Sequence, residues 1–227
     1  MAITPYYLSL ANPDDQDDPV LRQSLASEEE LTFSQVGLED PLEEQEDSVV
    51  PGLVHRYPDR VLMLVTQECA MYCRHCTRKR IWHDDEIPAS ISDERLAEMI
   101  KYLRNTPQVR EVIVSGGDPL ILPLKRLTHI LDALASVPTI EAVRLGTRVP
   151  VVMPMRVDAE LCATLGRYPF LWINTQFDHP NEITEESTAA CQALQRAGIP
   201  MSNQSVLLKG INDNVDTMIK LCYGLQR

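Results

Sequence analysis

The sequence lacks any apolar run close to the ~20 residues that a membrane-spanning helix needs. It also lacks a secretory signal, and it is larger than the small secreted domains that depend on disulfides. Basic residues are outnumbered by 33 acidic to 21 basic, which argues against nucleic-acid binding because that function needs a basic footprint. These absences predict a cytoplasmic protein with reduced thiols, no membrane segment and no nucleic-acid partner.

The acidic excess is confined to the first 50 residues. This segment carries 13 acidic residues and one basic residue, Arg22, whereas residues 51–227 carry 20 of each sign. Four prolines also interrupt any long helix there. We therefore expect a solvated, partly disordered acidic arm at residues 1–50 and a body at residues 51–227. The apolar stretch at residues 6–10 is expected to dock on the body or on a neighbouring subunit.

Strand and helix patterns alternate from residue 61 onward, with no internal repeat and no low-complexity segment. We expect strands at residues 61–65, 110–115, 142–146, 171–176 and 201–208, and helices at residues 92–104, 124–136, 158–166, 184–197 and 215–225. This alternation predicts an α/β fold with a parallel sheet. Right-handed connections would curl the strands into a partial (β/α) barrel that stops after about five βα units.

Polar residues follow several of the expected strands. After the first strand come three cysteines, and the later strand ends carry Ser-Gly-Gly-Asp at 115–118, Thr147-Arg148, Gln176 with Asp178, and Asn203-Gln204. Chemistry in barrels of parallel strands is placed at the carboxyl ends of the strands. We therefore expect these residues to converge on one cavity above the sheet.

The cysteines Cys69, Cys73 and Cys76 have the spacing C-x3-C-x2-C. Three thiolates on one short loop can reach three corners of a metal centre, whereas a closed zinc site needs four ligands. An iron–sulfur cluster held by three thiolates leaves one iron open for a small molecule. The remaining cysteines stand in helical patterns and are expected to pack: Cys162, Cys191 and Cys222.

A non-catalytic zinc-binding interaction module is the alternative from another class. In it, the three cysteines would share a metal with His55, His75 or His83, and the acidic arm would bind a partner. Iron and sulfide in the purified protein would favour the cluster, and one zinc ion per chain without sulfide would favour the module.

Longer strings surround the cysteine motif. They are His-Arg-Tyr-Pro-Asp-Arg at 55–60, Cys-Arg-His-Cys-Thr-Arg at 73–78, Asn-Thr-Pro-Gln-Val-Arg at 105–110 and His-Pro-Asn-Glu-Ile-Thr-Glu-Glu-Ser-Thr at 179–188. The cysteine motif after a first strand resembles the radical S-adenosylmethionine (SAM) enzymes. The strings together resemble the lysine 2,3-aminomutase family, over residues 1 to about 213.

The resemblance implies an isomerase that interconverts L-lysine and β-lysine through a substrate radical bound to pyridoxal phosphate (PLP). A [4Fe-4S] cluster, SAM, an external one-electron reductant and a homo-oligomeric full-length protein are implied with it. Glutamate or arginine as the amino acid substrate, or a homologue that modifies a protein lysine, remain alternatives within the family.

The resemblance also assigns residues to the site, and none of them is assigned as a catalytic acid or base. Cys69, Cys73 and Cys76 would hold the cluster, and Arg78 would pair with the substrate α-carboxylate through two parallel hydrogen bonds. SAM contacts fall on His75, Ser115, Gly116, Gly117, Asp118, Gln176 and Gln204. PLP contacts fall on Arg56, Tyr57 and Arg60.

Two of these assignments have simpler readings as well. Ser-Gly-Gly-Asp is by itself a turn signal, and His75 also fits a solvent-facing loop histidine. In the family, the PLP lysine follows a glycine-rich segment, and none of the five lysines here does. We therefore expect the chain to be a fragment that lacks the C-terminal part and has no aminomutase turnover of its own.

Overall fold

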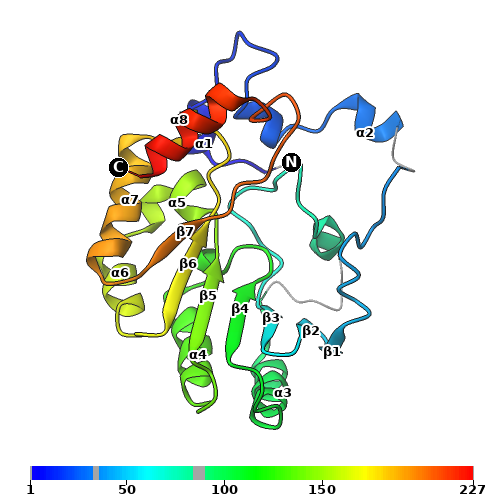
Figure 1. Ribbon diagram of the computed structural model, residues 1–227, viewed down its shortest axis with the longest axis vertical. Coiled ribbons are helices and arrows are strands. Elements are labelled where there is room, and N and C mark those ends of the chain that lie inside the picture. The colour runs from blue at the N-terminus through cyan, green and yellow to red at the C-terminus, as the bar shows by residue number, and fades with distance from the viewer. Residues whose placement is uncertain (1, 33–35, 84–89, 227) are drawn as a thin grey trace.

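A seven-stranded sheet forms the centre of the protein, in a computed structural model that describes residues 2–32, 36–83 and 90–226. Its strands lie in chain order: β1 (Ser48–Val50), β2 (Leu53–Tyr57), β3 (Arg60–Leu64), β4 (Glu111–Ser115), β5 (Ala142–Gly146), β6 (Leu171–Thr175) and β7 (Met201–Asn203). β1, β2 and β3 pair antiparallel, and β3 to β7 pair parallel. The expected α/β fold is confirmed, and the sheet remains open rather than closing into a barrel (Figure 1).

Helices follow the parallel strands as the sequence predicts. The longer ones are α3 (Asp93–Arg104), α4 (Leu124–Ala135), α6 (Ala159–Leu165), α7 (Glu185–Arg196) and α8 (Val215–Leu225). Short α-helices are α1 (Pro5–Ser9), α2 (Glu28–Thr32) and α5 (Val149–Val152), and 3-10 turns are η1 (Leu21–Gln23), η2 (Lys79–His83), η3 (Pro119–Ile121), η4 (Pro154–Arg156) and η5 (Pro180–Glu182). Within the described residues, no helix has the length and apolarity to cross a membrane.

The bounds of the longer helices have local causes. The Ser92 side chain accepts a hydrogen bond from the Arg95 amide and caps α3. The buried face of α3 then repeats at helical spacing through Leu96, Met99, Ile100 and Leu103. After α7, Gly198 adopts φ +84°, a left-handed conformation that glycine allows without strain.

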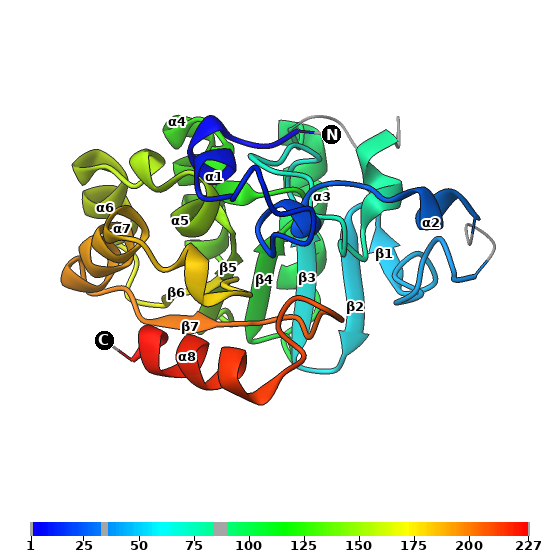
Figure 2. The same ribbon diagram turned by 90° about the horizontal axis from the view of Figure 1, so that it is seen from above.

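The two faces of the parallel sheet differ in burial. In β4, Val112 and Val114 are fully buried toward the helices, whereas the alternate residue Ile113 is only half-buried. In β6, Trp172 is 46% exposed between two buried neighbours. The main core therefore lies between the sheet and its helices, and the opposite face is more open, as expected for an incomplete barrel (Figure 2).

The expected strand at residues 201–208 is wrong beyond residue 203. The Val206 amide donates to Asp178 Oδ1 at 2.7 Å, and the Leu208 amide donates to Asn212 Oδ1 at 2.7 Å. Side-chain oxygens thus accept the amide hydrogen bonds that a neighbouring strand would otherwise accept. Leu207, between these two residues, is 71% exposed. The β1–β2 hairpin was not predicted, although it turns at Pro51-Gly52 with φ +83° at the glycine.

The arm is not the solvated segment that its composition predicts. Tyr7 and Gln23 are fully buried, and α1 packs against α5 on the body. This confirms that residues 6–10 dock on the body. Asp14, Asp15 and Asp17 are exposed as expected.

Candidate active site

The Gly-Gly turn after β4 clamps the backbone that leads into the cysteine loop. The Gly117 amide donates to the Thr66 carbonyl at 2.5 Å, and the Asp118 amide donates to the Glu68 carbonyl at 2.7 Å. A Cβ at Gly116 would lie 2.2 Å from Thr66 O, and one at Gly117 would lie 2.0 Å from Glu68 O. Only glycine fits this approach, so the Gly-Gly pair fixes where the loop begins.

Asp118 ties the ends of two strands together. Its carboxylate accepts hydrogen bonds from Thr147 Oγ1 at 2.6 Å, from the Arg148 amide at 2.7 Å and from the Leu120 amide at 3.0 Å. Burial raises the pKa of Asp118, although these donors oppose that shift. Every one of these contacts is internal to the protein, so the carboxylate is engaged in positioning the loops after β4 and β5.

The three motif cysteines lie half-buried on the loop after β3. The Arg78 amide donates to Cys76 Sγ at 3.3 Å, and Arg148 Nη1 donates to Cys73 Sγ at 3.1 Å. Burial raises the thiol pKa of Cys69 and of Cys76. Three soft sulfur donors in a partly dry loop suit an iron–sulfur cluster, which would stabilise their thiolate forms.

A single metal ion finds less support. Within the described part of the chain, no three His, Cys, Asp or Glu side chains gather closely enough to hold one ion. His55 Nδ1 lies 2.7 Å from the Tyr102 hydroxyl, on the hairpin side of the molecule. The side chain of His83 is outside the described residues. A cluster spreads its ligands over several irons, so the three thiols fit a cluster better than a zinc ion.

A buried guanidinium lies below the cysteine loop. Arg148, 5% exposed, donates through Nη2 to Glu182 Oε1 at 2.7 Å and to the Tyr7 hydroxyl at 3.3 Å. Gln23 Oε1 accepts a further hydrogen bond from it. The sequence placed Arg148 at a strand end but gave it no role, and it gave no sign of Tyr7 or Gln23, which the arm brings in.

The basic run beside the loop is paired with the arm. Arg78 Nε lies 2.9 Å and 3.0 Å from the two Glu44 oxygens, and Arg80 Nη2 lies 2.9 Å from Glu44 Oε2. Burial opposes ionisation of Glu44, but the two arginines hold its pKa below the usual range. Arg74 and Lys79 pair with Glu30. The acidic arm therefore neutralises the charges next to the site, although its composition suggested that its charge is unrelated to the body.

The residues assigned to SAM lie around this centre with uneven exposure. His75 and Gln176 are half-buried, Ser115 is half-buried and Gln204 is exposed. Seven buried side-chain polar atoms have no hydrogen-bond partner within the described residues, and four of them belong to this part of the molecule: His75 Nδ1, Arg148 Nε, Thr175 Oγ1 and Asp178 Oδ2. Burial lowers the pKa of His75 to about 4, so its ring is neutral at pH 7. Asp178 Oδ2 lies 3.5 Å from Arg148 Nη2 and 3.7 Å from His75 Nε2, so these three side chains belong to one buried polar cluster.

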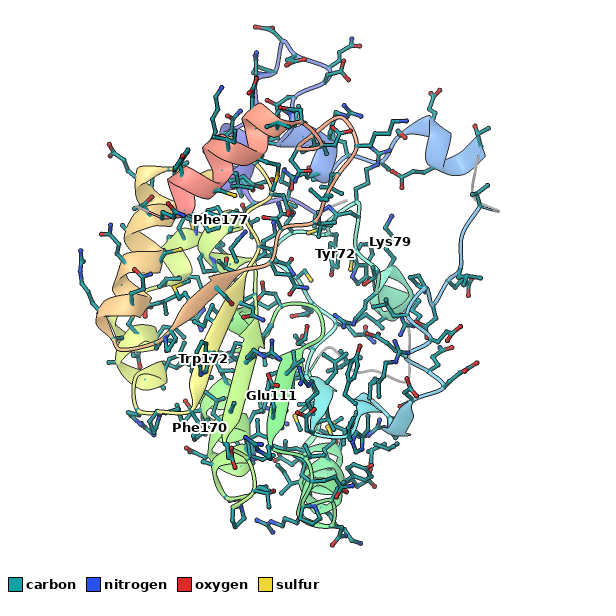
Figure 3. All side chains as sticks on the ribbon, in the orientation of Figure 1. Tyr72, Lys79, Glu111, Phe170, Trp172 and Phe177 are labelled. Carbon is teal, nitrogen blue, oxygen red and sulfur yellow. The ribbon has the colours of Figure 1, made fainter. Side chains whose placement is uncertain are left out.

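The residues assigned to PLP lie elsewhere. Tyr57 pairs with Arg60 at the start of β3, whereas the cysteine loop leaves the other end of that strand. Arg60 faces Asp59 and Glu111, and Arg56 donates to Asp47 Oδ2 at 2.6 Å. Figure 3 shows Glu111 well away from Tyr72 and Lys79 of the cysteine-loop region. These arginines are paired with carboxylates of the chain, so the described residues do not form a fitting PLP site.

The packing expected of the other cysteines holds in part. Cys162 is buried in the main core. Cys191 is partly buried and packs against a second apolar cluster, which contains Tyr7 of the arm and Leu221 of α8. Cys222 is exposed on α8, so the expectation that it packs is wrong. It faces an apolar hollow of about 620 Å³ together with Leu207, Met218, Ile219 and Tyr223.

Comparisons with known proteins match this arrangement. The model of the Radical SAM superfamily matches residues 63–222. The chain is 54% identical over 227 residues to the L-lysine 2,3-aminomutase of Clostridium subterminale, covering 99% of this chain and 54% of that protein. It is 45% identical over 224 residues to the glutamate 2,3-aminomutase of Clostridioides difficile, covering 98% and 52%. The chain thus spans about half the length of the curated relatives it matches.

Solved structures share the fold at low sequence identity. Native anSMEcpe with bound AdoMet and a peptide aligns with a TM-score of 0.57 at 14% identity, covering 74% of this chain and 48% of that one. Streptococcus suis SuiB bound to S-adenosylmethionine aligns with a TM-score of 0.54 at 12% identity, covering 90% and 45%. At these identities the likeness concerns the fold alone.

Proposed function

The chain belongs to the radical SAM superfamily, and from this premise we propose that it functions as an amino acid 2,3-aminomutase that interconverts L-lysine and β-lysine. One observation carries the proposal: a three-thiol loop lies at the carboxyl ends of parallel strands with a carboxylate-binding arginine, Arg78, two residues beyond its last cysteine. Similarity to lysine 2,3-aminomutases over almost the whole chain supports the substrate class.

Each cysteine has a defined part in the proposal. Cys69, Cys73 and Cys76 hold the [4Fe-4S] cluster, and the Gly-Gly clamp fixes the start of their loop. When bound, the cluster and SAM supply a carbon-centred radical after one electron arrives from an external reductant. The chain itself shields the thiols from water in part, because all three cysteines are half-buried.

SAM contacts in the proposal are the seven residues assigned above. Support comes from the buried atom His75 Nδ1, which has no hydrogen-bond partner within the described residues. For Gly117 and Asp118, the geometry supports a positioning part, because their amides donate hydrogen bonds within the chain, and Gly116 permits the close approach to Thr66. PLP enters the proposal through the resemblance alone, and no step here runs through Arg56, Tyr57 or Arg60.

Arg78 orients the substrate through its α-carboxylate. Glu44 takes the Nε–Nη2 edge of the guanidinium, and within the described residues Nη1 has no hydrogen-bond partner. A carboxylate can therefore bind at the remaining edge, with the arginine plane already fixed by Glu44. Glutamate stays the second candidate substrate, because a glutamate 2,3-aminomutase is also similar over 98% of this chain.

The cluster assignment is tested by anaerobic reconstitution with iron and sulfide. Cys69→Ala, Cys73→Ala and Cys76→Ala should each abolish the broad visible absorbance and the bound sulfide, because a cluster needs all three protein thiolates. Cys222→Ala is the matched control, since that thiol is exposed and distant in the chain. Full iron content in Cys73→Ala would contradict the assignment.

The substrate role of Arg78 is tested separately, in a protein of the relatives' full length, because this chain spans about half of that length and is expected to have no turnover of its own. Arg78→Lys keeps the charge but loses the paired geometry, so the apparent affinity for lysine should fall strongly. Reductive cleavage of SAM should continue, which separates substrate binding from the cluster. Amino acid analysis for β-lysine against β-glutamate distinguishes the two candidate substrates. Unchanged lysine affinity in Arg78→Lys would rule out the carboxylate contact.

A further inference from the structure

Cys73 is the motif cysteine with a guanidinium directly on its sulfur. Arg148 Nη1 donates to Cys73 Sγ at 3.1 Å, and the arginine side chain is 6% exposed. Hydrogen bonds and charge near cluster sulfurs set the reduction potential of iron–sulfur centres. A buried cation at this distance stabilises extra negative charge on the cluster, so it favours the reduced state.

The acidic arm holds this arginine in place. Tyr7 and Gln23, both fully buried, accept hydrogen bonds from Arg148 Nη2. The Tyr7 hydroxyl also donates to Glu182 Oε1 at 2.5 Å, and Glu182 accepts Arg148 Nη2 at 2.7 Å. The guanidinium is therefore fixed between the arm and η5, with its Nη1 group aimed at the thiol.

The arm also holds the backbone on both sides of Cys73. The Tyr72 amide donates to the Ala2 carbonyl at 3.1 Å, and the Arg74 amide donates to the Gln23 carbonyl at 2.8 Å. The residues flanking the ligand thus gain their amide partners from two separate points of the arm, including Gln23, which also contacts Arg148. Side chain and backbone contacts converge on the same cysteine.

We propose that residues 2–23 of the arm are a structural part of the cluster site, and that Arg148 is a positioning residue that fixes Cys73 and raises the reduction potential of the cluster. This inference rests on the proposed ligation by Cys73. The inference goes beyond that ligation because it assigns a function to the arm and to Arg148. Ligand-orienting contacts of this kind are known to tune metal centres.

A purely structural role for the same contacts makes a different prediction. If Arg148 only anchored the arm, replacing it would lower the free energy of unfolding without changing the redox behaviour of the cluster. The two roles are therefore separated by the midpoint potential and the electron paramagnetic resonance spectrum of the reduced cluster, neither of which depends on turnover.

The experiment compares Arg148→Lys with the reconstituted wild-type chain. Lysine preserves the charge that balances Glu182 but loses the forked donor geometry, so the protein should still fold. We expect full iron content, a midpoint potential shifted to more negative values and an altered resonance spectrum. Arg144→Lys is the matched control, because Arg144 lies on β5, four residues before Arg148, and pairs with Glu111 rather than with a cysteine.

The part played by the arm is tested with Tyr7→Phe, which removes one hydroxyl and no charge. We expect a ferrous chelator to strip iron several-fold faster than from the wild type, because Arg148 loses one of its fixed partners. An unchanged potential in Arg148→Lys would overturn the role of Arg148, and an unchanged stripping rate in Tyr7→Phe would overturn that of the arm. A wild-type chain that takes up no iron would instead overturn the cluster assignment.

Discussion

Two arginine centres flank the cysteine loop, and the arm supplies acceptors to both of them. Arg148 lies on the buried side, where Glu182 is fully inaccessible and the guanidinium 6% exposed. Arg78 lies on the outer side with 22% of its side chain exposed, although its partner Glu44 is 6% exposed. Both centres pair a guanidinium with a carboxylate, but they differ in exposure to water. The free energy lost when the pair is broken should therefore be larger at Arg148 than at Arg78.

The acidic arm supplies partners to both arginines, but the two arginines differ in how completely they are paired. In the inner centre, both Nη groups of Arg148 donate hydrogen bonds, and its Nε–H donor has no partner within the described residues. The outer centre leaves one edge of Arg78 available. Pairing of both Nη groups suits an arginine that positions a ligand, and an available Nη1 group suits one that receives a substrate carboxylate.

The largest effect on the free energy of unfolding is expected when the inner centre, around Arg148, loses the Glu182 carboxylate. Glu182→Gln removes the carboxylate nearest to the buried charge of Arg148 and leaves only Asp178, at 3.5 Å, as its ion-pair partner. It also disturbs the hydrogen bonds that the Asp178 and His179 amides donate to Glu182 Oε2 at 2.5 Å and 2.9 Å. The free energy of unfolding should fall by about 3–5 kcal/mol. Urea denaturation under anaerobic conditions measures it. If the free energy of unfolding falls only as much as for an exposed pair, the burial of the Arg148–Glu182 pair does not increase its contribution to stability.

A smaller effect is expected at the outer centre. Glu44→Gln removes the shared partner of Arg78 and Arg80, but both guanidinia keep some contact with water. The loss should be about 1–2 kcal/mol, and it should shrink in high salt because solvent-exposed charge pairs are screened. The same denaturation series at two salt concentrations checks this. If Glu44→Gln lowers the free energy of unfolding more than Glu182→Gln does, and by the same amount at both salt concentrations, the outer centre is the more important of the two for stability.

The smallest effect is expected for a surface pair far from both centres. Arg110 and Glu141 are 64% and 62% exposed and pair at 2.7 Å. Glu141→Gln should change the free energy of unfolding by less than ~0.5 kcal/mol, as is usual for exposed pairs. Identical denaturation midpoints for this variant and the wild type would set the baseline for the other two.

Much of the body could be predicted from the sequence. Apolar strands and capped helices carry their own local signals, so β3 to β6 and the longer helices fall within a residue or two of expectation. The cysteine loop was placed correctly after the first parallel strand, and the strand-end residues Asp118, Thr147 and Arg148 do meet. The β1–β2 hairpin was missed, although Pro51-Gly52 between apolar pairs is a turn signal.

The role of the arm could not be predicted from composition. Acidic, proline-interrupted segments are usually solvated, and nothing local reveals that Glu44 faces Arg78 or that Tyr7 faces Glu182. Those pairings depend on tertiary contacts between segments far apart in the chain. The same limit applies to Arg56 and Arg60, whose partners Asp47 and Glu111 are likewise visible only in three dimensions.

The docking of the arm also has a consequence for how the chain folds. Neighbouring strands of the sheet are consecutive in the sequence, so the sheet can grow one unit at a time. Tyr7, in contrast, bonds Glu182, 175 residues away, and Arg22 bonds the Gly210 carbonyl, 188 residues away. Such distant contacts form late, because the loop they close carries a large entropy cost until the intervening structure exists. The arm precedes the sheet in the chain, yet it is therefore among the last segments to reach its native place.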